Sequence, residues 1–343
     1  MPARARAGDN CRMSDTVHPY ETLTPDLVLD ALASVGLYGD GRLMALSSYE
    51  NRVYQVQLEE AVEGQPQVVV KFYRPGRWSD EAIAEEHAFA AELAAAEVPA
   101  VAPLVLQGHT LHHHGGFAFA VSPRRGGRMP ELDDVEVLEW IGRFLGRIHA
   151  VGERQPFTHR PRLDIASFGQ EPREWLLAQG AIPLEVEGLW ARTCEQALSA
   201  VGEAFDRCQS PVLRLHGDCH PGNILWVPDE GPHFVDLDDA RMGPSVQDLW
   251  MLLSGERAQR QRQLGTLLDG YEQMREFDRR ELALIEALRT LRLIHYSAWL
   301  ARRWDDPAFP AAFPWFGTRD YWQGQVQTLE DQLEAMDEPA LVA

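Results

Sequence analysis

Short apolar runs separated by turn residues fill the first third of the chain, a pattern that predicts a mainly antiparallel sheet. The polar stretch 47–51 divides the first two runs and predicts a hairpin turn. A helix is predicted to cross the sheet from its cap at Ser79 to about Glu97, and another begins at Thr24, where Pro25 suits the first helical position. The predicted strands are residues 43–46, 53–58, 68–72, 101–106 and 117–121.

Helical periodicity replaces this pattern after a glycine- and proline-rich linker at residues 123–130. Apolar side chains recur at helical spacing over 135–150, and 185–208 has the same character. The sequence therefore predicts an α+β, two-lobed fold with a small antiparallel-sheet lobe and a larger, mainly helical lobe. Short strands inside the helical lobe are predicted at residues 213–215, 224–226 and 234–235.

Domain boundaries follow from the same changes in pattern. Residues 1–20 carry no periodic apolar pattern, so they are predicted to form a disordered tail. The sheet lobe is expected at residues 21–123 and the helical lobe at residues 124–343. A chain of 343 residues is long enough for two such units.

Composition and charge exclude several classes of protein. The formal net charge is −20, which argues against a broad nucleic-acid surface because such surfaces are basic. No apolar run is long enough to span a membrane, and no secretory signal pattern follows the arginines near the N-terminus. The four cysteines form no C-x-x-C pair and are expected to be free thiols in a reducing compartment. We therefore expect a cytoplasmic protein that inserts into no membrane and binds no nucleic acid.

The most informative segment runs from His216 to Asn223 and reads His-Gly-Asp-Cys-His-Pro-Gly-Asn. Its aspartate is Asp218, and a second aspartate, Asp236, follows the apolar pair at 234–235. Protein kinases use the same order, with a catalytic-loop aspartate, a magnesium-binding asparagine and a magnesium-binding aspartate at a strand end. The pattern predicts phosphoryl transfer and a protein-kinase-like fold. The alternative is a polar turn between two strands, with Asp and Asn as turn formers.

The residue types suit this chemistry. Asp218 is predicted to accept the proton of the attacking hydroxyl group. Asn223 and Asp236 offer the hard oxygen ligands that Mg²⁺ prefers, so Asp236 is assigned to catalysis and to metal binding. His216 and His220 are interpreted as hydrogen-bonded supports of the loop rather than as catalysts.

A positive group for the nucleotide phosphates is expected upstream of this motif. Lys71 lies in the apolar run 68–72, where an unpaired ammonium group would be costly to bury. Lys71 is predicted to contact phosphate and to pair with a glutamate of the next helix. Glu86 is preferred to Glu85, on the spacing found in related kinases. In the alternative, Lys71 lies on an edge strand with its ammonium group in water.

No glycine-rich loop precedes this lysine. The hairpin turn offers Ser47 and Ser48 instead, whose hydroxyl groups and backbone amides are expected to cover the phosphates of ATP. Adenine is expected at residues 120–123, where the two lobes join. The three histidines at 112–114 are predicted to form a solvated hairpin turn, because neighbouring residues of an extended segment do not point one way as metal ligands must.

These motifs resemble the aminoglycoside phosphotransferase-like branch of the protein-kinase-like superfamily, which also includes choline kinases. The resemblance rests on residues 216–223 and on Phe-Val-Asp-Leu-Asp-Asp at 234–239. Further stretches are similar to the bacterial stress response kinase A family, and the likeness extends over nearly the whole chain from about residue 22. These stretches are residues 47–54, 69–75, 248–253, 304–310 and 313–315.

The resemblance implies a cytoplasmic, monomeric serine/threonine protein kinase that uses ATP with Mg²⁺ as its cofactor. It also implies a role in envelope stress and in protection from stress-induced death. Carried over by position, it implies that Asp218 accepts the proton, that Asn223 and Asp236 bind Mg²⁺, and that Ser48 lies at ATP.

Three other functions remain open from the residues alone. A small-molecule kinase could phosphorylate a hydroxyl group of an aminoglycoside- or choline-like cationic alcohol, and the acidic charge balance suits such a substrate. A non-catalytic nucleotide-binding scaffold would normally lack one of the three motif residues, and none is lacking. A structural domain without any ligand is the third.

Two side chains near the motif bear on regulation. Cys219 adjoins Asp218 and is either a redox-sensitive thiol or an inert buried one. Ser245 is the only residue of the short link after Asp236 that could take a phosphate. We therefore expect an active site that forms without activation-segment phosphorylation. Asp248, in the first turn of a predicted helix, is expected to brace the catalytic loop.

Overall fold

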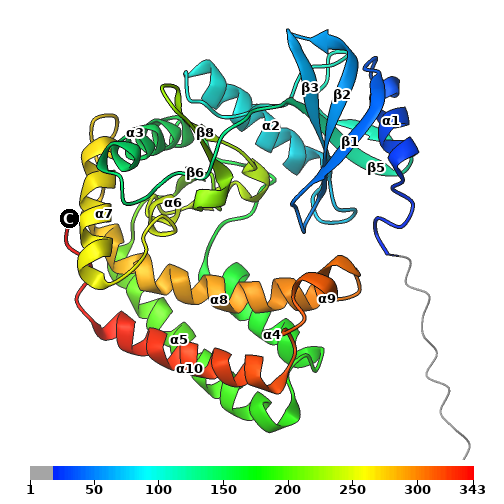
Figure 1. Ribbon diagram of the computed structural model, residues 1–343. Coiled ribbons are helices and arrows are strands. Elements are labelled where there is room, and N and C mark those ends of the chain that lie inside the picture. The colour runs from blue at the N-terminus through cyan, green and yellow to red at the C-terminus, as the bar shows by residue number, and fades with distance from the viewer. Residues whose placement is uncertain (1–17) are drawn as a thin grey trace, which may run out of the picture.

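The computed structural model describes residues 18–343, which form two lobes (Figure 1). Most of the predicted tail 1–20 lies outside the described residues. The N-terminal lobe is an antiparallel sheet in the order β1-β2-β3-β5-β4. Its strands are β1 (Gly39–Leu46), β2 (Arg52–Val62), β3 (Gln65–Phe72), β4 (His112–His114) and β5 (Phe117–Pro123).

Two helices pack on this sheet. Helix α1 (Pro25–Ser34) begins where the sequence predicts, because the Thr24 side chain accepts a hydrogen bond from the backbone N–H of Leu27. Helix α2 (Asp80–Ala95) is capped in the same way by Ser79. One apolar core lies between the sheet and α1, whereas Phe89 on α2 belongs to the core of the other lobe. Helix α2 therefore joins the two lobes.

Two predictions for the N-terminal lobe are wrong. Residues 101–106 form no strand, apart from a single bridge between Leu106 and His109, because Pro103 has no N–H group to donate to a ladder. Residues 112–114 are strand β4 rather than a turn. Gly115 and Gly116, both with positive φ, make the turn to β5 in their place.

The C-terminal lobe consists of helices around two small antiparallel sheets, β6–β9 and β7–β8. Strand β9 was not predicted, and β8 lies slightly earlier than the predicted strand 234–235. The strands are β6 (Leu213–Leu215), β7 (Ile224–Val227), β8 (Gly231–Phe234) and β9 (Arg241–Gly243). The helices are α3 (Val135–Gly152), α4 (Glu171–Ala178), α5 (Leu184–Cys208), α6 (Gln247–Trp250), α7 (Arg257–Tyr271), α8 (Ile285–Arg302), α9 (Ala308–Ala312) and α10 (Arg319–Asp337).

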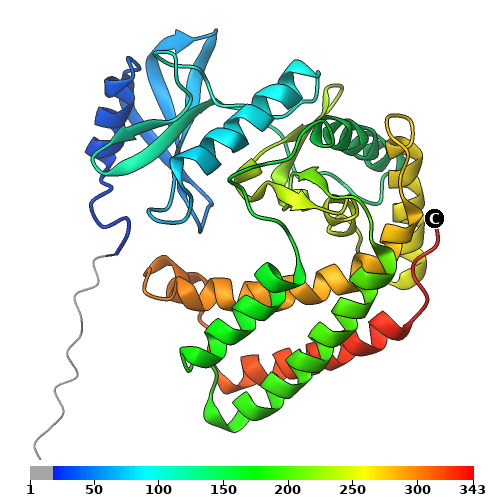
Figure 2. The same cartoon turned by 180° about the vertical axis from the view of Figure 1, so that it is seen from behind.

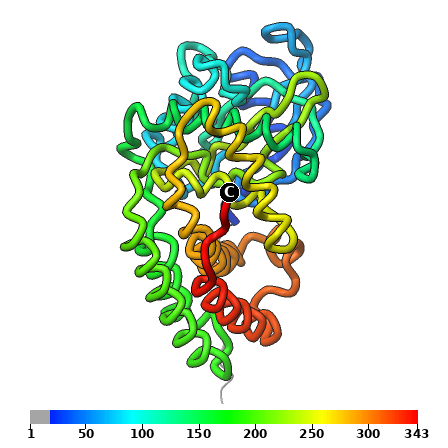
Figure 3. The backbone as a smooth tube through the Cα atoms, turned by 90° about the vertical axis from the view of Figure 1, so that its left-hand side faces the viewer, coloured from blue at the N-terminus to red at the C-terminus, as the bar shows by residue number. Residues whose placement is uncertain are grey.

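Helices α5, α8 and α10 pack together below the small sheets in Figure 1, and Figure 2 shows the same arrangement from behind. Helix α3 packs against α7 beside the sheets. The chain ends next to the start of α7, where Arg257 donates hydrogen bonds to the carbonyl groups of Pro339 and Ala340 (Figure 3). Within residues 18–343, no helix combines the length and the apolar character that crossing a bilayer requires.

Candidate active site

The catalytic-loop sequence lies directly after β6, and a buried aspartate holds it. The carboxylate of Asp248 accepts hydrogen bonds from the backbone N–H groups of His216 and Gly217, both at 2.8 Å. Gly217 has a φ of +86°, and a Cβ there would lie 2.1 Å from the carbonyl oxygen of Asp239. Only glycine fits this turn. The expectation that Asp248 braces the loop is confirmed by these contacts.

The Asp218 carboxylate lies in a cavity, with one oxygen held by the protein. Its Oδ1 accepts a hydrogen bond from Nη1 of Arg292 on α8 at 2.6 Å. Its Oδ2 lies 3.6 Å from Nε2 of His220. Oδ2 is therefore the oxygen that is available to a substrate hydroxyl group.

Asn223 and Asp236 lie at the same end of the β7–β8 pair, just before β7 and just after β8, and both line the two cavities described below. The side-chain Nδ2 of Asn223 donates to the backbone carbonyl of Asp218 at 2.9 Å, which leaves its Oδ1 unused. The backbone N–H of Val235 donates to the carbonyl of Asn223 and fixes the distance between the two segments. Asp236 takes a left-handed conformation with a φ of 59°, so its carboxylate turns away from the strand direction.

These two residues fit a magnesium ion. They present a carboxylate and an amide oxygen, which are hard ligands of the kind Mg²⁺ prefers. Residues 18–343 contain no group of three or more His, Cys, Asp or Glu side chains that could hold a metal ion by themselves. Magnesium often needs only one or two protein oxygens, because water and phosphate complete its coordination.

Lys71 lies in the middle of the sheet, opposite Val53 on β2 and Ala120 on β5. Its Nζ lies 3.0 Å from Asp236 Oδ1, and it lies 3.7 Å from Glu86 Oε1. The Lys71 side chain is 16% exposed, so the alternative with its ammonium group in water is wrong. The predicted pairing of Lys71 with Glu86 is confirmed.

Glu85, the other candidate partner of Lys71, binds a different segment of the chain. Its carboxylate accepts hydrogen bonds from the backbone N–H groups of Thr158, His159 and Arg160. It therefore ties α2 to the loop that follows α3.

The charges around Lys71 compensate one another. Burial acts to lower the pKa of Lys71, but the carboxylates of Asp236, Asp238 and Glu86 outweigh it and hold that pKa well above its usual value. Burial raises the pKa of Glu86 despite the opposing charge of Lys71. Lys71 therefore stays positively charged at neutral pH.

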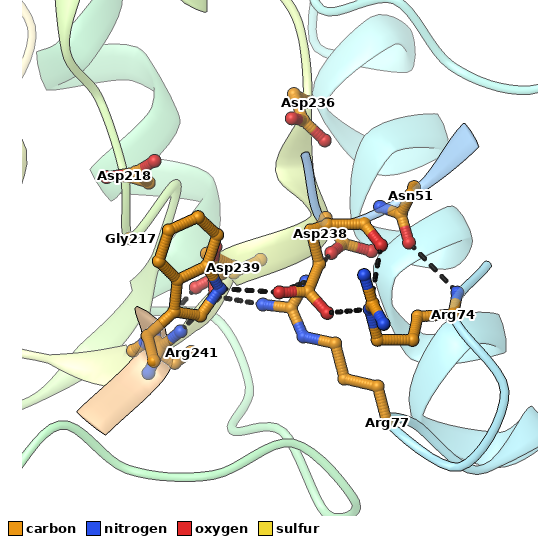
Figure 4. A network of polar contacts seen from close by, with 12 residues as sticks. Asn51, Arg74, Arg77, Gly217, Asp218, Asp236, Asp238, Asp239 and Arg241 are labelled. Carbon is orange, nitrogen blue, oxygen red and sulfur yellow. Dashed lines mark hydrogen bonds and ion pairs between the residues drawn. The ribbon is translucent and has the colours of Figure 1, made fainter. Parts of the chain in front are cut away.

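Sequence reasoning assigned no role to Asp238, Asp239 and Arg77, which also belong to this network. Arg77, from the segment after β3, contacts Asp238, and its Nη2 lies 2.8 Å from Asp239 Oδ1 (Figure 4). Burial acts to raise the pKa of Asp238, but Lys71 and Arg77 outweigh it and lower that pKa. The two aspartates stand in the segment 234–239 on which the resemblance rests, but nothing in the sequence marks Arg77 as their partner.

Two cavities meet at these residues. The first, about 330 Å³, lies under the sheet and is lined by Lys71, Glu86 and the lobe junction at 120–123 among others. The second, about 480 Å³, contains Asp218 and opens toward α8. Both cavities share one wall, and its residues are Ser47, Ser48, Gly222, Asn223 and Asp236.

The remaining side chains near the motif are structural. His216 donates a hydrogen bond from Nε2 to the Val235 carbonyl, and His220 Nδ1 accepts one from the N–H of Gly222, so both histidines support the loop. Cys219 is fully buried, and burial raises the pKa of its thiol well above the usual value, which favours the inert thiol. Ser245 is 2% exposed, which leaves a modifying enzyme little access to its hydroxyl group.

Comparison with known proteins agrees with the geometry. The model of the phosphotransferase enzyme family matches residues 43–285. Serine/threonine protein kinase RdoA of Salmonella typhimurium is 48% identical over 329 residues, which cover 96% of this chain and 98% of that protein. Stress response kinase A of Escherichia coli K12 is 47% identical with the same coverage.

Solved structures share the fold at low sequence identity. Amicoumacin kinase hAmiN, in complex with AMP-PNP, Ca²⁺ and Ami, has a TM-score of 0.68 at 17% identity over 92% of this chain and 94% of that one. A microcompartment-associated aminopropanol kinase has a TM-score of 0.66 at 16% identity over 92% and 97% of the two chains. The predicted two-lobed fold is thereby confirmed. The chain belongs to the phosphotransferase enzyme family and, within it, to the stress response kinase A group.

Proposed function

We propose that this kinase is a serine/threonine protein kinase that depends on ATP and Mg²⁺ and acts on protein hydroxyl groups in a bacterial stress response. The observation that supports the proposal is the wall shared by the two cavities, because a nucleotide in the first cavity would then lie next to Asp218 in the second. The names of the relatives in Salmonella and Escherichia support the substrate class and the link to stress. A monomer in the cytoplasm, active in envelope stress and in protection from stress-induced death, is part of the same proposal.

ATP occupies the first cavity in this proposal. Its adenine lies at residues 120–123, and its phosphates lie below Ser48 and beside Lys71, which Glu86 holds in place. When bound by Asn223 and Asp236, Mg²⁺ supplies positive charge that neutralises the phosphate oxygens.

The substrate hydroxyl group enters from the second cavity. Oδ2 of Asp218 accepts its proton while the hydroxyl oxygen forms a bond to the γ-phosphorus. The bond from that phosphorus to the bridging oxygen breaks, and ADP leaves with the electron pair. Arg292 holds the other oxygen of Asp218, so that the carboxylate keeps one orientation throughout.

The test is the variant Asp218→Ala. We expect phosphate transfer to a generic protein substrate to fall by about a hundredfold or more, the scale of a positioned acid or base. Affinity for a non-hydrolysable ATP analogue with magnesium should be retained. The exposed residue Asp206 on α5 provides the control Asp206→Ala, which should transfer at the wild-type rate. Wild-type turnover by Asp218→Ala would remove this carboxylate from the mechanism.

A small-molecule kinase is the second candidate, and the lining of the second cavity favours it. Tyr296 and Trp299 stack there with ring centroids 5.6 Å apart, close to several carboxylates, and aromatic faces attract cations. Incubation with labelled ATP separates the two candidates. Label on protein supports the first, and label on a cationic alcohol with none on protein supports the second.

A further inference from the structure

The loop Ser47–Asn51 connects β1 and β2 and contributes Ser47 and Ser48 to the wall that the two cavities share. It contains no glycine. Glycine-rich loops approach phosphates by backbone flexibility, whereas this loop must be held in position by other contacts. In Figures 1 and 2 the β1–β2 hairpin ends above α9 of the other lobe. The contacts at that point are made by buried charges.

Glu50, the fourth residue of the loop, binds residues at the end of α8. Its Oε2 accepts hydrogen bonds from Nε of Arg303 and from Nε1 of Trp299, both at 2.5 Å. Its Oε1 accepts from Nη2 of Arg303 at 3.0 Å. The Glu50 side chain is 12% exposed, so these bonds are largely shielded from water.

Asp306, between α8 and α9, makes the reciprocal contact to the N-terminal lobe. Its carboxylate lies 2.9 Å from Nη2 of Arg52 and 2.7 Å from Nη2 of Arg74. The Asp306 side chain is 1% exposed. Arg74 also contacts Glu50, with Nε 3.0 Å from Oε1, so a single guanidinium group joins the two carboxylates.

Aromatic rings complete the contact. Tyr49 of the loop packs on Phe313, with ring centroids 4.9 Å apart, and its edge also meets Phe309 on α9. The loop is therefore bound to the C-terminal lobe on the side that faces away from the first cavity.

We propose that Glu50 and Asp306, with Arg52, Arg74 and Arg303, form an interlobe clasp that positions the Ser47–Asn51 loop over the phosphates of ATP. The inference rests on the proposed function and names positioning residues for it. Breaking a buried, hydrogen-bonded ion pair leaves an uncompensated charge, so the loop cannot lift while the clasp is closed. The clasp replaces the glycines that other kinases use at this place.

The clasp is also connected to Lys71 through Arg77 and Asp238. Nη1 of Arg77 lies 3.8 Å from Glu50 Oε2, and the same guanidinium group contacts Asp238. Asp238 in turn lies 3.2 Å from Nζ of Lys71. A change in the loop is therefore transmitted to the group that binds phosphate.

The test compares two ligands on the full-length protein. In Glu50→Gln, affinity for a non-hydrolysable ATP analogue with magnesium should fall about tenfold, the scale of one lost charge-assisted hydrogen bond. Affinity for adenosine, which has no phosphates, should stay at the wild-type value. The exposed ion pair of Glu338 with Arg257 gives the matched control Glu338→Gln, which should change neither affinity. Titration calorimetry measures both.

Arg303→Gln removes the ion pair between Arg303 and Glu50 from the α8 side and serves if Glu50→Gln does not fold. An equal loss of affinity for both ligands would mean general destabilisation and would contradict the proposed clasp. The clasp would also be contradicted if the nucleotide affinity of Glu50→Gln could not be distinguished from that of Glu338→Gln. Failure of the wild-type protein to bind the ATP analogue at all would instead refute the proposed function.

Discussion

Arg292 on α8 is the one side chain that donates a charged hydrogen bond to the carboxylate of Asp218 within the described chain. Holding a reacting group in one orientation accounts for a large part of enzymatic rate enhancement. In Arg292→Met we therefore expect the transfer rate at saturating ATP to fall by about tenfold. Affinity for the ATP analogue should not change, because Arg292 lines only the second cavity.

The variant Arg292→Lys tests whether this role is positional. A lysine keeps the charge, so it should recover part of the rate that methionine loses. Arg302→Met on the same helix, which removes a pair with Glu171, is the control and should transfer normally. Equal rates in Arg292→Met and the wild type would show that Asp218 needs no such support.

Glu281 should make the free energy of unfolding depend on pH. It is 2% exposed, and burial raises its pKa to about 7, although its Oε2 accepts a hydrogen bond from the N–H of Val246. A carboxyl group whose pKa is raised on folding stabilises the fold below its unfolded pKa of 4.5, and this contribution is lost as the pH rises through about 7.

In Glu281→Gln this loss should disappear. The free energy of unfolding of the variant, relative to wild type, should rise between pH 5 and pH 8 by about 2 kcal/mol. Urea unfolding at several pH values measures the difference. The exposed residue Glu334 gives the control Glu334→Gln, whose difference from wild type should be constant. A constant difference for Glu281→Gln as well would contradict the assignment.

Among the elements, α3 and α7 approach so closely that their contact requires glycine. A Cβ on Gly142 of α3 would lie 2.0 Å from the carbonyl oxygen of Leu267, and one on Gly270 of α7 would lie 2.1 Å from that of Glu139. The backbones of the two helices are therefore in direct contact. This packing matters for the site because α3 also carries His149, whose Nε2 lies 3.1 Å from the Asp248 carboxylate that braces the catalytic loop.

Gly142→Ala should force the helices apart and lower the free energy of unfolding by about 1 to 3 kcal/mol, as overpacking does. Gly265 offers a matched comparison on α7, since a Cβ there meets nothing within 4 Å. Gly265→Ala should raise stability by about 0.5 to 1 kcal/mol through helix propensity alone. Thermal or urea unfolding checks both, and equal effects would show that α3 and α7 can separate without cost.

At the scale of the whole molecule, each lobe has its own apolar core, and charged side chains gather where the two lobes meet. The core of the N-terminal lobe and the core of the C-terminal lobe are separate clusters. Between them lie the two cavities, and charged side chains that neutralise one another locally form the Lys71 network and the clasp beside these cavities. The net charge of −20 therefore describes the outer surface more than the active site.

The sequence alone determined the two-lobed fold and the residues of the catalytic motif. Apolar periodicity is a local property, and Asp218 and Asn223 lie so near in the chain that their spacing fixes one short loop. Lys71 was identified because a lysine in an apolar strand needs a partner. Two local errors, at residues 101–106 and 112–114, arose where prolines and glycines decided which segment could join the sheet.

Only the tertiary structure decided which distant side chains complete the site. Arg77 meets Asp238 across 161 positions of sequence, Arg292 meets Asp218 across 74, and Arg52 meets Asp306 across 254. An ion pair leaves no periodic trace in a sequence, because each partner is an ordinary charged residue until the chain brings the two together. Where the pair is buried, as for Asp238 and Asp306, losing one partner would cost about 3 to 5 kcal/mol, a large part of the net stability of a typical domain.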